Sequence, residues 1–332
     1  MNLSDRILGC LTGLAVGDAL GMPTEMLTQE QIREEFGWVE GLRSAPSWHP
    51  HHLLAPGRIT DDTGQMLSVA HAFDENGNLF AEKVAEKLLD WTDQEKDILD
   101  FILGPSTQRA LTELRKGGDP RQTGQQGKTN GATYRAVSVG LVNVHHPERL
   151  MPQVVEVCLP THGTTVAISG AAAIATAIAE ACQDHSTLES IISAAMVNAV
   201  EGRKYGTWVW STPLETRIKL AVDLAQENPE PVAALKRIAE LVGVDMLVPE
   251  SVAAVFGIIT LAKGDPMKAV IYGANIGGDT DTIAALAGAI CGAWMGNASI
   301  DPAMVSEIEK VSKINLKAEA EHLEKLAKAS RE

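Results

Sequence analysis

Helical periodicity runs along almost the whole of this chain of 332 residues. Between Arg6 and Leu20, apolar side chains recur one and three positions apart, a spacing that gathers them on one face of a helix. The alternation of apolar and polar residues that is typical of strands is hard to find. We therefore predict an all-α fold, with further helices over 64–73, 81–91, 106–116, 132–141, 166–182 and 283–294, and a charged helix over 308–332 whose end frays.

Two of these predicted helices, 166–182 and 283–294, are rich in Ala and Gly. Small side chains let helix backbones approach closely, so we expect the pair to pack at the centre of a bundle. The apolar fraction of 45% is enough for a sizeable core, and the length is compatible with one large domain or with two closely packed ones.

Charge and cysteine content narrow the class of protein. The net charge of −15 argues against a general affinity for nucleic acid, which requires a basic surface. The start of the chain lacks a basic segment followed by a long apolar core, and no uninterrupted membrane span is apparent, so we expect a cytoplasmic protein. Cys10, Cys158, Cys182 and Cys291 are scattered and predict four buried thiols.

Two acid-rich phrases lie near opposite ends of the chain, Thr60-Asp61-Asp62-Thr63 and Gly277-Gly278-Asp279-Thr280-Asp281-Thr282. Each runs into an apolar helical stretch, and Thr60 is suited to cap the helix that starts near Asp61. Helix capping explains either phrase alone, but one cap does not need so many oxygen atoms. If the phrases converge, four carboxylates repel one another, and two divalent cations would balance them. Oxygen ligands favour magnesium, manganese or calcium over zinc.

Four motifs occur in a characteristic order, namely Gly17-Asp18-Ala19-Leu20-Gly21, Pro23-x-Glu25, Gly57-x-x-Thr60-Asp61-Asp62-Thr63 and the phrase from Gly277 to Thr282. In these motifs the chain resembles the ADP-ribosylglycohydrolase family, and the resemblance extends from Gly9 to Trp294. It implies a compact orthogonal multi-helix bundle that forms a single domain over 1–332. It also implies a binuclear Mg²⁺ or Mn²⁺ site that hydrolyses the bond between ribose C1″ and an acceptor.

Carried over by position, the resemblance assigns roles to individual residues. The catalytic set is Glu25, Asp61 and Asp62, with Glu25 as the proton-transfer group that is not a metal ligand. The expected metal ligands are Thr60, Asp61, Asp62, Asp279, Asp281 and Thr282, whereas Thr63 and Thr280 are assigned to helix capping. Substrate binding falls to Asn130, Gly131 and Ala132, where a loop leads into a helix near Thr133 and could receive a diphosphate, and to His162 in the cleft.

The chain departs from the family pattern near the acceptor. Many relatives carry an Asp before a G-x-x-T segment, but here Ile102 and its apolar neighbours stand there, and Asp100 is the nearest carboxylate. The run around His162 is also reduced. Both changes point to a different leaving group.

Two further clusters have competing interpretations. Trp208 and Trp210 are expected in the core, or else stacked on a nucleobase in the cleft. His49, His51 and His52 are interpreted as part of a solvated, proline-rich surface loop within 41–58.

Three functions stay open. The leading one is hydrolysis of an ADP-ribosylated protein or small molecule. The alternatives are hydrolysis of a ribonucleoside or related N-glycoside, and non-catalytic binding of an ADP-ribose-type ligand. The choice between Mg²⁺ and Mn²⁺ and the oligomeric state are open as well.

Overall fold

The structure, a computed structural model, describes residues 1–329, apart from the side chains of Asp100 and Phe101. Its regular elements are α-helices and short 3₁₀ helices (η): α1 (Leu3–Gly21), η1 (Met22–Thr24), α2 (Gln29–Phe36), η2 (Pro50–Leu53), α3 (Asp61–Ala70), α4 (Ala81–Gln94), α5 (Leu99–Ile102), α6 (Pro105–Arg115), α7 (Gly131–Val142), α8 (Pro147–His162), α9 (Thr165–Ala181), α10 (Leu188–Gly202), α11 (Leu214–Glu227), α12 (Pro231–Leu241), α13 (Val248–Leu261), α14 (Pro266–Ala274), α15 (Thr280–Met295), η3 (Asn297–Ser299), α16 (Pro302–Ser312) and α17 (Leu316–Ala329). Within the described residues, β pairing is limited to two isolated bridges, Thr129 with Leu247 and Thr164 with Thr207. The all-α prediction is confirmed.

Helix positions follow the apolar periodicity closely, since α1, α3, α4, α6, α7, α9 and α15 each cover a predicted range to within a few residues. The single helix predicted over 308–332 is wrong. Two helices, α16 and α17, occupy this stretch, and they separate at Lys313, whose φ of 56° lies in the left-handed region and ends α16. The expected fraying concerns residues 330–332, which lie outside the described part of the chain.

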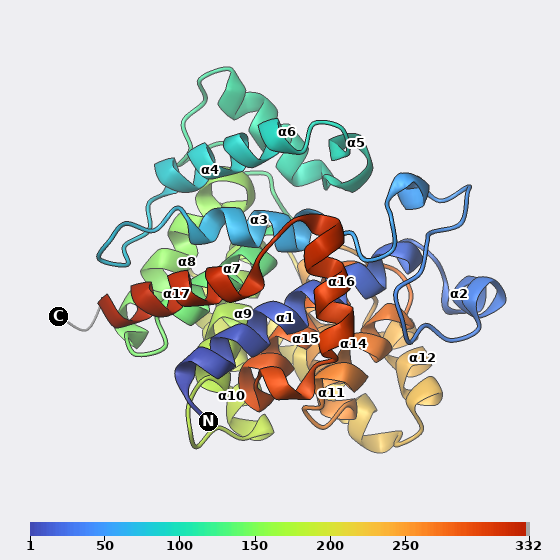
Figure 1. Ribbon diagram of the computed structural model, residues 1–332. Coiled ribbons are helices and arrows are strands. Elements are labelled where there is room, and N and C mark those ends of the chain that lie inside the picture. Colours follow the sequence, from blue (N-terminus) through green and yellow to red (C-terminus); the bar gives the residue numbers. More distant parts are fainter. Residues whose placement is uncertain (330–332) are drawn as a thin grey trace.

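The closest helix pair is α1 with α15, which run antiparallel through the middle of the molecule (Figure 1). Glycines of α1 recur every fourth residue, at Gly9, Gly13, Gly17 and Gly21, and each lies against the backbone of α15. A Cβ atom on Gly13 would lie 2.1 Å from the carbonyl oxygen of Gly288. The expected partnership of α9 with α15 exists, but α9 packs mainly on α10 and α7.

Burial explains the composition of α1. The stretch Leu3–Thr24 is long and apolar enough to cross a membrane by length and composition, yet 94% of its most apolar window is buried inside the protein. The main apolar cluster includes residues from Ile7 in α1 to Leu326 in α17, so α1 belongs to a core that joins both ends of the sequence. The four cysteines are free and buried, as predicted.

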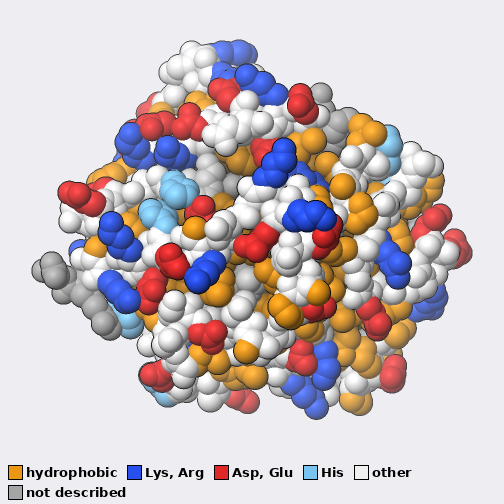
Figure 2. Space-filling model, in the orientation of Figure 1, with side chains coloured by type: hydrophobic (Ala, Val, Ile, Leu, Met, Phe, Trp, Pro, Cys, Tyr) orange, Lys and Arg blue, Asp and Glu red, His pale blue; other side chains and the backbone are white. Residues whose placement is uncertain are grey.

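Charged side chains of both signs are mixed over the face that Figure 2 shows. Lys and Arg do not gather there into a continuous basic surface.

Replacing Gly13 by Ala tests the contact between α1 and α15. Although Ala is the better helix former by about 1 kcal/mol, we expect Gly13→Ala to lower the free energy of unfolding by about 2 kcal/mol or more, because the helix backbones must separate. Chemical denaturation measures the change. Gly41→Ala is the control, since a Cβ there meets nothing within 4 Å, and its effect should stay within about 0.5 kcal/mol. Equal stability of the two variants would contradict the expectation.

Candidate active site

The two acid-rich phrases, far apart in the sequence, meet in one cavity. Asp61 and Asp62 in the first turn of α3 line this cavity together with Asp279 and Asp281 at the start of α15. Glu25, which follows η1, joins them, and carboxylate oxygens of Glu25, Asp279 and Asp281 all lie within 4.8 Å of one another. The convergence on which the predicted metal site depends is therefore present.

Two glycines bend the second phrase. Gly277 and Gly278 have φ values of 87° and 70°, in the left-handed region that favours glycine. The bend lets the N–H of Gly278 donate to the carbonyl of Leu27 at 2.9 Å, while the N–H of Met26 donates to the carbonyl of Gly278 at 2.7 Å. These two bonds join the second phrase to the two residues that follow Glu25, which brings Glu25 close to Asp279.

Asp18 of α1 holds the first phrase. It is fully buried and accepts hydrogen bonds from the N–H groups of Thr60 at 2.9 Å and Thr63 at 3.0 Å, and from the Thr63 hydroxyl at 2.6 Å. Thr60 caps α3 as predicted, because its hydroxyl accepts from the N–H of Asp62. Asp18 thus fixes the loop that presents the two acids.

The capping roles predicted for Thr63 and Thr280 are wrong. The Thr63 hydroxyl donates to Asp18, and the Thr280 hydroxyl donates to the carbonyl of Gly21 at 3.0 Å. Both threonines sit inside the first turn of their helices, so their side chains face α1. They join the metal phrases to α1 instead of capping α3 and α15.

Burial makes the ionised form of the acids in this site less stable than it would be in water. Burial raises the pKa of Asp18 to about 6 and that of Asp61 to about 7, and the other carboxylates of the cluster add to both shifts. Burial followed by the repulsion of neighbouring acids also raises the pKa values of Glu25, Asp62 and Asp279, and burial raises that of Asp281.

Two observations show that the protein itself does not satisfy all of these oxygens. Oδ2 of Asp62 is buried without a hydrogen-bond partner, and carboxylate oxygens of Asp279 and Asp281 lie within 4.8 Å of each other. Ionised carboxylates so close together repel one another. The residues present fit a site for divalent cations, which would satisfy both groups.

Helix α7 supports the first acid with residues that the sequence analysis did not identify. The Tyr134 hydroxyl donates to Oδ2 of Asp61 at 2.7 Å, and Nε2 of Gln65 donates to the same oxygen at 2.8 Å. Gln65 is in turn held by the fully buried guanidinium of Arg135. Tyr134 and Arg135 follow the Asn130 loop directly, but nothing in their spacing marks them as partners of α3.

The loop predicted to bind substrate contacts the acid cluster and also lines the cavity. Asn130 donates through Nδ2 to Oδ2 of Asp279 and to the Ser251 hydroxyl, so its amide group orients a carboxylate of the acid cluster. Thr129, Asn130 and Gly131 line the cavity, and α7 begins at Gly131, slightly before the predicted start. Ala132 is fully buried and is not a lining residue.

His162 lies behind this loop and does not line the cavity. A Cβ on Gly131 would lie 2.8 Å from its imidazole, and Nε2 is 2.9 Å from the Thr129 hydroxyl. Because Arg135 donates to Nδ1, the neutral ring carries its proton on Nε2 and donates to Thr129. Burial and then the charge of Arg135 hold the His162 pKa well below its usual value. The structure places this residue as a support of the substrate loop.

Among the described residues that line the cavity, Ile102, Gly104, Pro105 and Thr107 come from the segment that departs from the family pattern, and they carry no charge. The side chain of Asp100, the nearest carboxylate in the sequence, lies outside the described part of the structure.

Two clusters differ from expectation. Trp208 and Trp210 are 74% and 78% exposed, so the core interpretation is wrong, and neither lines the acid-lined cavity. His49 and His51 are buried beside Glu25, which contradicts a solvated loop, and His52 is exposed as expected.

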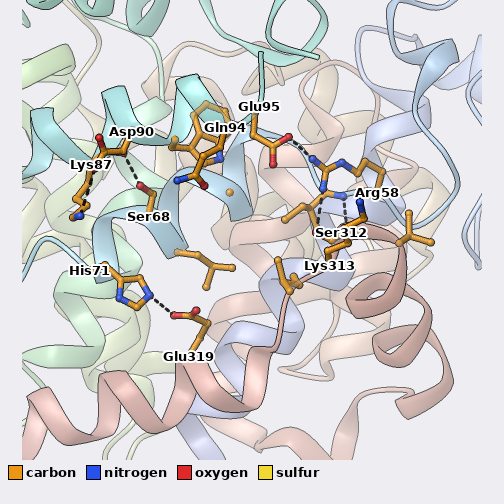
Figure 3. A pocket seen from close by; sticks show the side chains of 16 residues that line it. Arg58, Ser68, His71, Lys87, Asp90, Gln94, Glu95, Ser312, Lys313 and Glu319 are labelled. Carbon is orange, nitrogen blue, oxygen red and sulfur yellow. Dashed lines mark hydrogen bonds and ion pairs between the residues drawn. The ribbon is translucent and has the colours of Figure 1, made fainter. Parts of the chain in front are cut away.

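A roomier cavity lies on another face of α3, between α4 and the α16–α17 junction (Figure 3). Apart from Lys313, its charged side chains face one another in pairs, with His71 and Glu319 at 2.9 Å, Arg58 and Glu95 at 2.5 Å, and Lys87 and Asp90 at 3.5 Å. These pairs contrast with the crowded carboxylates of the acid-lined cavity.

Comparison with known proteins agrees with this site. The model of a protein family described as ADP-ribosylglycohydrolase matches residues 1–332. Uncharacterized protein YegU of Escherichia coli (strain K12) is 30% identical over 325 residues, 97% of each chain. The ADP-ribosyl-(dinitrogen reductase) glycohydrolase of Rhodospirillum rubrum is 30% identical over 164 residues, 48% of this chain and 52% of that protein.

A solved structure described as an ADP-ribosylglycohydrolase-related protein complex superposes with a TM-score of 0.70 at 25% identity and covers 99% of both chains. The family model and this structure each account for the entire fold that carries the acid cluster. The protein therefore belongs to the ADP-ribosylglycohydrolase family and is a hydrolase that acts on glycosidic bonds.

Proposed function

We propose that this enzyme is a Mg²⁺- or Mn²⁺-dependent hydrolase that cleaves the ribosyl C1″ bond of an ADP-ribosylated protein or small molecule. The observation that carries the proposal is the convergence of four buried aspartates and the partly exposed Glu25, with one Asp62 oxygen that lacks any hydrogen-bond partner. The names of relatives such as the R. rubrum glycohydrolase support the ADP-ribosyl group as substrate. Four free, buried cysteines are compatible with the cytoplasmic location that forms part of the proposal.

Two cations would be held by the acids at the starts of α3 and α15. These acids are Asp61, Asp62, Asp279 and Asp281, and Thr60 and Thr282 lie beside them as further ligands. Carboxylate and hydroxyl oxygens suit Mg²⁺ and Mn²⁺. Bound there, such ions supply Lewis acidity and lower the pKa of water. Tyr134 and Asn130 orient Asp61 and Asp279, so the ligand set is organised before substrate arrives.

Glu25 is the proposed proton acceptor. Its side chain is 12% exposed, so it reaches the cavity while most of its surface is shielded from water. Burial and the neighbouring carboxylates raise its pKa well above the usual value, which makes its carboxylate a stronger base. We assign to it the proton of the attacking water.

Different lining residues would contact the diphosphate and the leaving group of the substrate. Backbone N–H groups at the start of α7, beside Gly131, are proposed to receive the diphosphate at the positive end of the helix. The leaving group would face Ile102 and Pro105, which offer no charge to a guanidinium. We therefore propose an uncharged acceptor in preference to arginine. A nucleoside substrate would gain support if Trp208 and Trp210 faced the cavity. Both are exposed and neither lines it, so they give that alternative no support.

Substitution of the acids tests the metal-dependent mechanism. We expect Asp61→Asn and Asp281→Asn each to lower kcat by at least about a thousandfold, because each removes a charged ligand from a site that depends on preorganised charge. Turnover with added Mn²⁺ measures the loss, and circular dichroism checks that the helices persist. Asp223→Asn, which alters a surface carboxylate paired with Lys219, is the control. Full activity in either site variant would rule out the mechanism.

A turnover screen tests the substrate. With Mg²⁺ or Mn²⁺ present, we expect release of ADP-ribose from ADP-ribosyl-serine or O-acetyl-ADP-ribose, and at least about tenfold lower kcat/KM for ADP-ribosyl-arginine, a difference of roughly 1.4 kcal/mol in transition-state stabilisation. Cleavage of free ribonucleosides alone would refute the proposed substrate class. Chelation should abolish turnover and either metal should restore it.

Stability measurements test the charge balance of the site. The pKa values of Asp18 and Asp61 are raised by folding, so the native protein binds more protons than the unfolded chain, and these carboxyls progressively lose their stabilising effect as pH rises from about 4 through about 6 and about 7. Cations need the ionised acids. The difference in Tm between Mn²⁺ and chelator should therefore be larger at pH 7.5 than at pH 5.5, and smaller in Asp61→Asn. A metal effect independent of pH would contradict this account.

A further inference from the structure

The segment between α2 and α3 contributes a pair of buried histidines to the edge of the acid cluster. His49 and His51 are each 1% exposed, although they stand among prolines in a stretch without helical periodicity. Their imidazole rings lie edge to face with centroids 5.1 Å apart. Both contact Glu25, and no role in the proposed reaction has yet accounted for them.

His51 contacts the carboxyl group of Glu25. Its Nδ1 lies 3.0 Å from the carbonyl oxygen of Met22, and because a carbonyl only accepts, Nδ1 carries a proton. The opposite nitrogen, Nε2, lies 3.2 Å from Oε2 of Glu25. Because Nδ1 uses one proton for the Met22 carbonyl, a hydrogen bond across the Glu25 contact needs a second proton, carried by Nε2 or by Oε2. The contact ties one carboxyl oxygen of Glu25 to a ring that is anchored to the backbone after α1.

His49 contacts the backbone of the same residue. Its Nδ1 accepts the N–H of His51 at 3.1 Å, so the neutral ring carries its proton on Nε2. That nitrogen donates to the carbonyl oxygen of Glu25 at 2.7 Å. One histidine therefore holds the main chain of Glu25 and the other holds its side chain.

Fixing a glutamate at this point has a clear physical consequence. A Glu side chain loses rotamer freedom when it is ordered, and the neighbouring acids Asp281 and Asp279 repel its charge. A partner on Oε2 helps to offset both costs where the Glu25 carboxyl lies within 4.8 Å of carboxylate oxygens of Asp279 and Asp281.

We propose that His51 is a positioning residue of this enzyme, which acts through Glu25 by holding its carboxyl group at the edge of the acid cluster, while His49 fixes the Glu25 backbone. The inference rests on the proposed function for its effect on turnover. Its effect on cation binding requires no substrate, because the Glu25 carboxylate adds negative charge within 4.8 Å of the carboxylate oxygens of Asp279 and Asp281 without being a ligand itself. Histidines beside a ligand or proton acceptor orient it in the way that outer-sphere partners orient metal ligands.

The test compares His51→Ala with His51→Gln, whose amide nitrogen can still donate to Glu25. We expect His51→Ala to weaken Mn²⁺ binding and to lower kcat, each by about tenfold or more, and His51→Gln to stay within about threefold of the unaltered protein. Mn²⁺ binding is measured by the electron paramagnetic resonance signal of the free ion. His52→Ala is the matched control, because His52 belongs to the same 3₁₀ turn but is exposed, and it should change neither quantity.

Comparing the Glu25→Gln variant with the Glu25→Gln, His51→Ala double variant distinguishes an effect through Glu25 from a general loss of stability. In a Glu25→Gln background, His51→Ala should produce no further loss of Mn²⁺ affinity, because the carboxyl that it positions is gone. An unchanged Mn²⁺ affinity in His51→Ala, equal losses in the Ala and Gln variants, or the same loss in the Glu25→Gln background would each overturn the proposal. If the unaltered protein cleaves no ADP-ribosyl substrate, the proposed function fails, and the Mn²⁺ titrations still decide the role of His51.

Discussion

The backbone contact between α1 and α15 determines where everything else in the site can lie. The helices are antiparallel and glycine-lined, so the end of α1 meets the beginning of α15, where a Cβ on Gly21 would come within 2.4 Å of the Thr280 carbonyl. Asp18 and Glu25 come from the α1 end, and Asp279 and Asp281 from the α15 end. Asp18 then binds the loop before α3 and adds Asp61 and Asp62. One close helix crossing therefore assembles three separate segments.

The positions of the acids at helix N-termini also reduce the electrostatic cost of placing them close together. Asp61, Asp62 and Asp281 lie in the first turns of α3 and α15, where the helix dipole favours negative charge. Donors from Tyr134, Gln65 and Asn130 satisfy some carboxylate oxygens. These interactions are too few for all the acids, as the orphaned oxygen of Asp62 shows, so the folded chain retains an affinity for positive charge.

Local patterns predicted the parts of this structure that local forces determine. Helices were readable from apolar spacing, and the acid phrases from their oxygen content and order. The sequence does not predict that α1 packs on α15, because a glycine at every fourth residue indicates a close helix contact but does not identify the second helix. His49 and His51 were misjudged for a related reason, since their burial depends on Met22 and Glu25, which neither periodicity nor spacing connects to them. Trp208 and Trp210 show the reverse error, because aromatic content suggests burial and the fold leaves them exposed.

The pairing of α1 with α15 also has a consequence for how the chain is made. The ribosome produces α1 early, yet the surface that covers its glycine face appears only when α15 has been synthesised, after most of the other helices. Contacts between segments so distant in sequence form late and slow the folding of a domain. Throughout that interval, an apolar helix fit to enter a membrane by composition stays without its native cover. The acid cluster therefore cannot form before the start of α15 has been made and has joined α1, so a shorter, partly synthesised chain lacks it.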